Sequence, residues 1–224
     1  MRPPRIHPML VTIVSAALSA VEGVHFTECT GCPVCGGSLR GYDTKKKQFA
    51  VVMDGDKRRA LYVYVKRFYC KECTRLCYAD EPFYTGTRIG SPVIDLGLTI
   101  SATMTPNRVA TYLAALGIVV DRTTFRLYAK RTFPTVPTTD VFGIRIPLSV
   151  VTLSTFATGT GEGGRVIGAE VLAACGFPSA YRAPPHLPLR GKEGDERHEQ
   201  EHKEERQVHE PHDHGDKKGH GQQD

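Results

Sequence analysis

Two closely spaced cysteine pairs, Cys32-x2-Cys35 and Cys70-x2-Cys73, constrain the fold of this chain more than any other feature. The pairs are separated by 34 residues. A structural zinc ion takes four ligands in tetrahedral geometry, with thiolate sulfurs at about 2.3 Å. The pattern therefore predicts that an intervening hairpin brings the two pairs together around one Zn2+ ion, which is the expected cofactor. A four-thiolate site has no open coordination position, so we expect a structural role rather than a catalytic one.

Three other cysteines are not needed for such a site. Cys29 and Cys77 flank the pairs, and the spacing leaves open whether either replaces one of the four ligands or packs as a small apolar side chain. Disulfides do not suit a chain with no other sign of secretion. A redox role needs one such pair within a βαβ unit, which the sequence does not show. Cys175 lies in an apolar stretch and is expected to be buried and inert.

The residues between the cysteine pairs have the pattern of a β-hairpin. Gln48–Met53 is short and β-prone, Asp54–Arg58 is a turn signal, and Ala60–Tyr69 is rich in β-branched and aromatic residues. Alternation places Tyr62 and Tyr64 on one face of the second strand. The sequence therefore predicts a small zinc ribbon built on this hairpin.

The N-terminal segment predicts an amphipathic helix from about Pro8 to Val21. Helical spacing places five apolar residues on one face: Leu10, Val14, Ala17, Leu18 and Val21. A signal peptide is the alternative, but its apolar run would be short and interrupted by polar residues. No run of 18 apolar residues occurs, so we expect no membrane-spanning helix. Cysteines that resemble metal ligands suit a reducing compartment, so we expect a cytoplasmic protein.

Three helices are predicted after the ribbon, with N-caps at Ser91, Thr105 and Asp121. Gly117 suits the end of the second helix. The last two helices have the layout of a helix-turn-helix, although a plain three-helix bundle is the alternative. In a helix-turn-helix the final helix would offer side chains to the major groove and to phosphates, and these are Arg122, Thr123, Arg126, Lys130 and Arg131.

The charge distribution favours a polyanionic partner. Residues 1–131 contain 19 Lys and Arg against 10 Asp and Glu, whereas residues 190–224 contain 7 against 11. A basic body of this kind suits double-stranded DNA, whose phosphates attract Lys and Arg. We expect further phosphate contacts from a lysine run in the ribbon, Lys45, Lys46 and Lys47.

The C-terminal part has less to interpret. A Pro- and Thr-rich linker over residues 132–140 precedes an apolar run at 146–157 that periodicity does not assign to strand or helix. Another apolar run is expected to form a helix ending at Gly176, after a Gly-rich turn at 159–164. The polar, His-rich tail is expected to be disordered, and the sequence leaves open whether it binds metal weakly or only solubilises the chain.

The order of these modules resembles the N-terminal region of prokaryotic insertion-sequence transposases. The resemblance covers about residues 32–131, through the four cysteines and the helical pattern from Ala110 to Tyr128. It implies a ribbon followed by a helix-turn-helix that recognises the ends of an element. Those transposases continue into a ribonuclease-H-like domain with three metal-binding carboxylates, whereas residues 132–189 contain only Asp140, Glu162 and Glu170. The resemblance therefore implies a DNA-binding half without the nuclease, and not an enzyme.

Together these patterns predict an α+β protein in which a small β zinc ribbon precedes a three-helix helix-turn-helix unit. The expected segments are a lead-in (1–28), the ribbon (29–84), the helix-turn-helix (85–131), a linker with a small apolar segment (132–190) and the disordered tail (191–224). We expect a zinc-stabilised, sequence-specific double-stranded DNA-binding protein, with a protein–protein interaction module or transcription-associated adaptor as the alternative. The sequence leaves open the DNA site, the role of residues 139–189 and whether the chain forms a homodimer.

Overall fold

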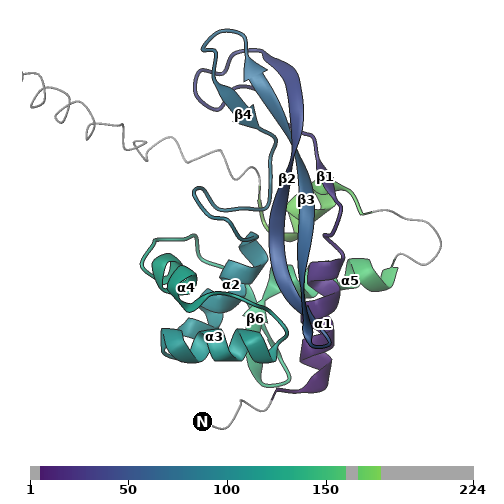
Figure 1. Cartoon of the computed structure of the whole chain (residues 1–224), viewed down its shortest axis with the longest axis vertical. Coiled ribbons are helices and arrows are strands. Elements are labelled where there is room, and N and C mark those ends of the chain that lie inside the picture. The colour runs from purple at the N-terminus through teal and green to yellow at the C-terminus, as the bar shows by residue number, and fades with distance from the viewer. Residues whose placement is uncertain (1–5, 160–165, 178–224) are drawn as a thin grey trace, which may run out of the picture. The chain divides into compact units, whose positions relative to one another are not determined.

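A long antiparallel hairpin, formed by β2 (Leu39–Asp54) and β3 (Lys57–Cys70), is the central element of the fold (Figure 1). The strands turn at Gly55, whose φ of +59° suits glycine. Register runs from the Asp54↔Lys57 pair at the turn to the Leu39↔Cys70 pair at the far end. The predicted hairpin is confirmed, and it is longer than the sequence pattern indicated.

The computed structural model describes residues 6–159 and 166–177, all within the unit Met1–Arg182. A second unit, Ala183–Asp224, lies outside the described residues, so the predictions for the His-rich tail stay untested. The other described elements, in chain order, are α1 (Pro8–Ser19), β1 (His25–Phe26), β4 (Leu76–Tyr78), α2 (Ser91–Ser101), α3 (Pro106–Ala115), α4 (Arg122–Ala129), β5 (Thr138–Val141), β6 (Ile144–Pro147), α5 (Leu148–Gly159) and α6 (Gly168–Ala174).

The main sheet is built around β3. β1 pairs with it in parallel, β2 in antiparallel, and the short β4 pairs with its last residues in antiparallel. A separate two-stranded sheet contains β5 and β6. Helices α1 to α5 gather toward the end of the hairpin that carries the turn, α6 lies beside β1, and β4 lies at the opposite end (Figure 1).

The predicted N-terminal amphipathic helix is confirmed as α1. All five residues of its predicted apolar face are buried: Leu10, Val14, Ala17, Leu18 and Val21. α1 packs against α5, so this segment is part of the core of the fold. Among the described helices, none is long and apolar enough to cross a membrane.

The three helices after the ribbon are confirmed, and two of the three predicted N-caps hold. The carboxylate of Asp121 accepts hydrogen bonds from the backbone N–H groups of Thr123 and Thr124. Thr105 is the N-cap of α3, and Gly117 follows that helix with a φ of +83°. Both are the positions that helix-end chemistry favours.

The predicted N-cap at Ser91 is wrong by one residue. Gly90 is the N-cap, and Ser91 is the first residue of α2, where it is buried. The Gly90 N–H donates to the carbonyl of Phe49, and a Cβ at position 90 would lie 2.2 Å from the Phe49 ring. The close approach of Phe49 therefore fixes where the chain enters α2, which local sequence does not reveal.

The segment after residue 132 completes the core. The predicted linker is shorter than expected, because β5 begins at Thr138. The apolar run that was ambiguous between strand and helix contains both, since β6 ends at Pro147 and α5 begins at the next residue. Proline lacks the N–H that a strand ladder uses, which accounts for the end of the strand at Pro147 and the start of a helix after it. Ile146, Val150 and Leu153 are buried in the same hydrophobic cluster as α1 and the hairpin.

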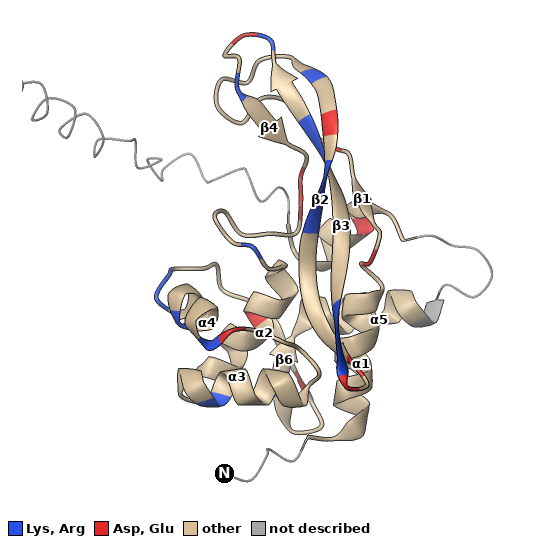
Figure 2. Ribbon diagram, in the orientation of Figure 1, with Lys and Arg blue, Asp and Glu red and all other residues tan. Residues whose placement is uncertain are grey.

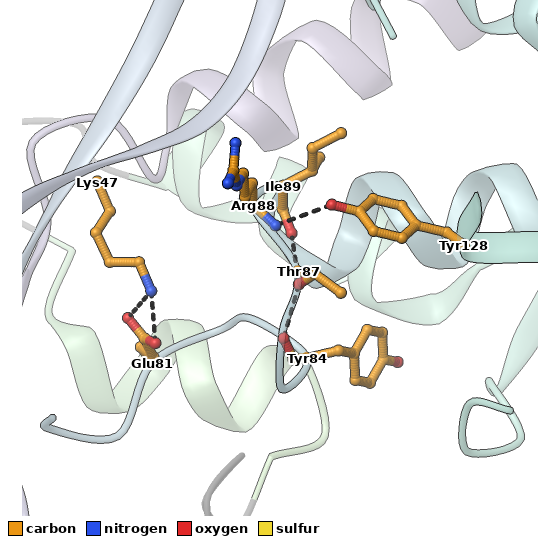
Figure 3. Close-up of polar contacts among 7 residues, drawn as sticks. All are labelled: Lys47, Glu81, Tyr84, Thr87, Arg88, Ile89 and Tyr128. Carbon is orange, nitrogen blue, oxygen red and sulfur yellow. Dashed lines mark hydrogen bonds and ion pairs between the residues drawn. The ribbon is translucent and has the colours of Figure 1, made fainter. Parts of the chain in front are cut away.

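An ion pair between the half-buried Lys47 and the buried Glu81 joins the hairpin to the loop after β4 (Figure 3). The Lys47 Nζ lies 2.6 Å and 2.7 Å from the two carboxylate oxygens of Glu81, whose side chain is 1% exposed. The same ammonium lies 4.3 Å from the centre of the Phe83 ring. Removing one partner of a buried pair leaves the other charge uncompensated, which is strongly destabilising.

We therefore expect Lys47→Met to lower the free energy of unfolding by about 3 kcal/mol. The matched control is Lys46→Met, because Lys46 is exposed and its ammonium lies over the ring of Tyr62 rather than beside a buried carboxylate. That change should cost less than about 1 kcal/mol. Urea unfolding of both variants measures the difference, and equal losses would contradict the role assigned to the Lys47–Glu81 pair.

A second buried acid lies on α2. The Tyr84 hydroxyl donates a 2.5 Å hydrogen bond to Asp95, which is 2% exposed. Burial raises the pKa of Asp95 to about 6, and the hydrogen bond from Tyr84 only partly opposes it. Because this pKa is higher in the fold than in the unfolded chain, ionisation of Asp95 destabilises the fold as pH rises through this interval.

Asp95→Asn should therefore stabilise the protein above pH 6, by at most about 3 kcal/mol for a shift of two pKa units. The amide keeps an oxygen that accepts the Tyr84 hydrogen bond. The advantage should disappear below about pH 4, where Asp95 is protonated in both states. Thermal melts of both proteins across this range are the measurement, and a gain independent of pH would contradict the assignment to Asp95 ionisation.

Candidate metal centre and candidate nucleic-acid interface

The four predicted metal ligands come together at the end of the hairpin opposite its turn. The sulfur atoms of Cys32, Cys35, Cys70 and Cys73 all lie within 4.8 Å of one another. The Cys32–Cys73 and Cys35–Cys70 sulfur pairs are each 3.5 Å apart. Tetrahedral coordination at about 2.3 Å requires sulfur separations of about 3.8 Å, so small shifts of these thiols suffice. The four cysteines can hold a metal ion, and a purely thiolate donor set suits zinc.

The hairpin register explains why pairs so distant in sequence meet. Leu39 pairs with Cys70, so the start of β2, just after the first cysteine pair, lies beside the end of β3. Two tight loops then present the thiols. In the first, the Gly36 N–H donates to the Cys32 carbonyl at 2.8 Å. In the second, the Thr74 N–H donates to the Cys70 carbonyl at 3.1 Å.

The protein environment favours the thiolate form at one of these cysteines. Burial opposes ionisation of Cys32, but hydrogen bonds from the backbone of Cys35 and Val34 outweigh it and lower the pKa to about 6. Backbone N–H groups aimed at sulfur stabilise the charged form, which is the form that binds metal. Glu72 also borders the site: it accepts hydrogen bonds from the Ser38 hydroxyl at 2.8 Å and from the Cys70 thiol at 3.3 Å. The sequence pattern does not indicate that Ser38 and Glu72 border the site.

The remaining cysteines differ in their surroundings. Cys77 is buried, and its sulfur lies 3.7 Å from that of Cys32. Cys29 is half-buried, and its thiol donates to the Gly31 carbonyl at 3.5 Å. Cys175 is half-buried at the end of α6, where burial raises its pKa to about 12. Cys175 is therefore less buried than predicted, and its raised pKa lowers the fraction of reactive thiolate.

The α4 helix has one buried and one exposed side. Phe125 and Tyr128 are buried. The predicted DNA-contacting residues all lie on exposed positions of the helix or just after it: Arg122, Thr123, Arg126, Lys130 and Arg131. Leu127 lies among them with 62% of its surface exposed, and the sequence analysis did not single it out.

Hydrogen bonds fix α4 against neighbouring elements. The backbone N–H of Arg88 donates to the Tyr128 hydroxyl at 3.0 Å (Figure 3). The Arg131 guanidinium donates to the Gly86 carbonyl at 3.1 Å. From the exposed side, Arg126 donates to the amide oxygen of Asn107 on α3 at 2.7 Å. The helix is thus held in place by both its buried and its exposed residues.

The lysine run, from which phosphate contacts were predicted, is divided between the two faces of the hairpin. Lys46 pairs with Tyr64 in the sheet register, while its neighbours pair with Val63 and Val65. Because directly paired residues share a face, Lys46 lies on the opposite face from Lys45 and Lys47. Lys47 is also engaged by Glu81, so its ammonium is not available as a simple phosphate contact. Figure 2 shows the Lys and Arg residues distributed along the hairpin and on α4.

Comparison of the chain with protein-family models, with curated proteins and with solved structures gives no match. The site is therefore interpreted from its own geometry.

We expect the purified chain to contain about one zinc ion, and Cys32→Ser to lose most of it because a fourth thiolate is removed. Cys175→Ser is the matched control, since its thiol belongs to α6 and not to the cysteine cluster. Elemental analysis by mass spectrometry measures both. Equal metal content in the two variants would show that the four-cysteine cluster is not the binding site.

Proposed function

We propose that this chain is a zinc-stabilised protein that binds double-stranded DNA sequence-specifically and has no catalytic activity. The exposed face of α4 is the observation that carries the proposal. Arg122, Arg126 and Lys130 are exposed along it, while Phe125 and Tyr128 attach its other side to the core. A helix of this kind offers guanidinium groups to guanine edges and ammonium groups to phosphates.

The arrangement of α3 and α4 supports a helix-turn-helix. The two helices pack against each other, and only a short segment, residues 116–121, connects them. Gly117 ends the first helix and Asp121 caps the second. In such units the second helix enters the major groove. The exposed Leu127 would then suit apolar contact with a thymine methyl group.

The metal centre has a structural role in this proposal. When a zinc ion is bound, it would join the two cysteine loops across the open end of the hairpin, held by Cys32, Cys35, Cys70 and Cys73. The order of ribbon and helices also resembles the N-terminal region of insertion-sequence transposases. The proposal therefore combines a metal-fixed sheet with a helical reader in the cytoplasm, and it includes no reaction.

A protein–protein interaction module or adaptor is the second candidate, favoured by exposed apolar side chains near the cysteines. Val34, Tyr69 and Leu76 expose 47%, 41% and 40% of their surfaces. Tyr69 and Leu76 are also paired neighbours in the sheet. The other tyrosines considered for this role, Tyr62 and Tyr64, are half-buried and lie against Lys46 and His25.

Fluorescence anisotropy with duplex DNA at several salt concentrations separates the two candidates. We expect affinity to fall steeply with salt, because binding releases counterions from the phosphates. Arg126→Ala should relax sequence preference, and Lys46→Ala should weaken all duplexes alike and reduce the salt slope by about one. Arg145→Ala on β6 is the control for loss of one exposed positive charge.

The proposal fails if duplex binding is absent at low salt, or if affinity does not change with salt. If duplex binding is absent, and a partner protein binds the unaltered chain but not Tyr69→Ser, the interaction module is favoured instead.

A further inference from the structure

Cys77 is a fifth thiol at the candidate metal centre. It lies on β4, where it pairs with Phe68 of β3, so it is presented by the sheet rather than by either cysteine loop. Its side chain is 4% exposed. It packs in one cluster with Cys32, Cys70 and the half-buried Cys73. Three of the four candidate ligands therefore belong to the same small cluster as Cys77.

The geometry of Cys77 suits coordination. Its sulfur lies 3.7 Å from the Cys32 sulfur. The edge of a tetrahedron of thiolates around zinc is about 3.8 Å, as calculated from metal–sulfur bonds of about 2.3 Å. Cys77 is thus already placed at a ligand-to-ligand distance from one member of the site.

The four candidate ligands are not equally protected. Cys35 is exposed, whereas Cys32 and Cys70 are buried and Cys73 is half-buried. Cys35 belongs to the loop that precedes β2, and Cys77 is held by pairing between β3 and β4. Loss of Cys35 from the site would therefore leave the other three ligands in one cluster with Cys77.

From these observations we propose that Cys77 is a reserve zinc ligand, which takes the coordination position of Cys35 when that thiol is unavailable. The inference rests on the metal centre proposed above. In the alternative site the ion is held by Cys32, Cys70, Cys73 and Cys77, and the Cys77 thiol releases its proton to solvent as its sulfur binds. The donor set, its total charge and its closed geometry remain the same.

Cobalt substitution tests this directly, because the sulfur-to-cobalt absorption reports how many thiolates bind the ion. The full-length chain is compared with Cys35→Ser, Cys77→Ser and the double variant, each loaded with Co2+. We expect Cys77→Ser to match the unaltered chain, and Cys35→Ser to retain a four-thiolate spectrum. The double variant should lose most of the absorption, because only three thiolates remain to hold the ion.

Cys35→Ser combined with Cys175→Ser is the matched control for removing two thiols, since Cys175 directly follows α6 and is not part of the cysteine cluster. It should keep the four-thiolate spectrum, and circular dichroism establishes that every variant is folded. If Cys35→Ser and the Cys35/Cys77 double variant have the same reduced spectrum, Cys77 is not a reserve ligand. If the unaltered chain shows no sulfur-to-cobalt absorption, the metal centre itself is wrong, and DNA binding is tested separately.

Discussion

The pairing of β2 with β3 is the interaction on which the rest of the structure depends. The same register places Leu39 beside Cys70 at one end and buries Val63 and Val65 in the core along the middle. A slip by one residue would turn every side chain to the opposite face of the sheet. It would therefore separate the cysteine pairs and expose the core at once, so the metal centre and the hydrophobic core are specified by one set of hydrogen bonds.

The two ends of the hairpin have different sources of stability. Toward the turn, β2 and β3 pack against the helices, and the Met53 N–H even donates to the Gly117 carbonyl after α3. At the cysteine end, the small cluster of Cys32, Cys70 and Cys77 is separate from the main core. A cluster of that size buries little apolar surface, so coordination by thiolates is the natural source of order there. In our proposal, metal and core stabilise the two ends of one element that positions the DNA-reading helix.

Features governed by local chemistry were predictable from sequence. The apolar face of α1, the cap at Asp121 and the stop at Gly117 follow from spacing and residue type, and all three are found. The thiol pairs were also predictable, because metal geometry restricts the spacing of ligands.

Features governed by tertiary contacts were not predictable in this way. The start of α2 depends on Phe49 packing over Gly90, from a strand some forty residues away. The split of the lysine run depends on sheet register, and the engagement of Lys47 depends on Glu81 in a loop beyond β4. The hydrogen bond from Ser38 to Glu72 beside the thiols likewise requires both cysteine loops to be in place.

X-ray absorption spectroscopy at the zinc edge of the purified chain tests the central claim most directly, because it reports the atoms bound to the metal. The account predicts a single shell of four sulfur atoms at about 2.3 Å. A chain without zinc, a shell containing nitrogen or oxygen ligands, or cysteines joined as disulfides would contradict it.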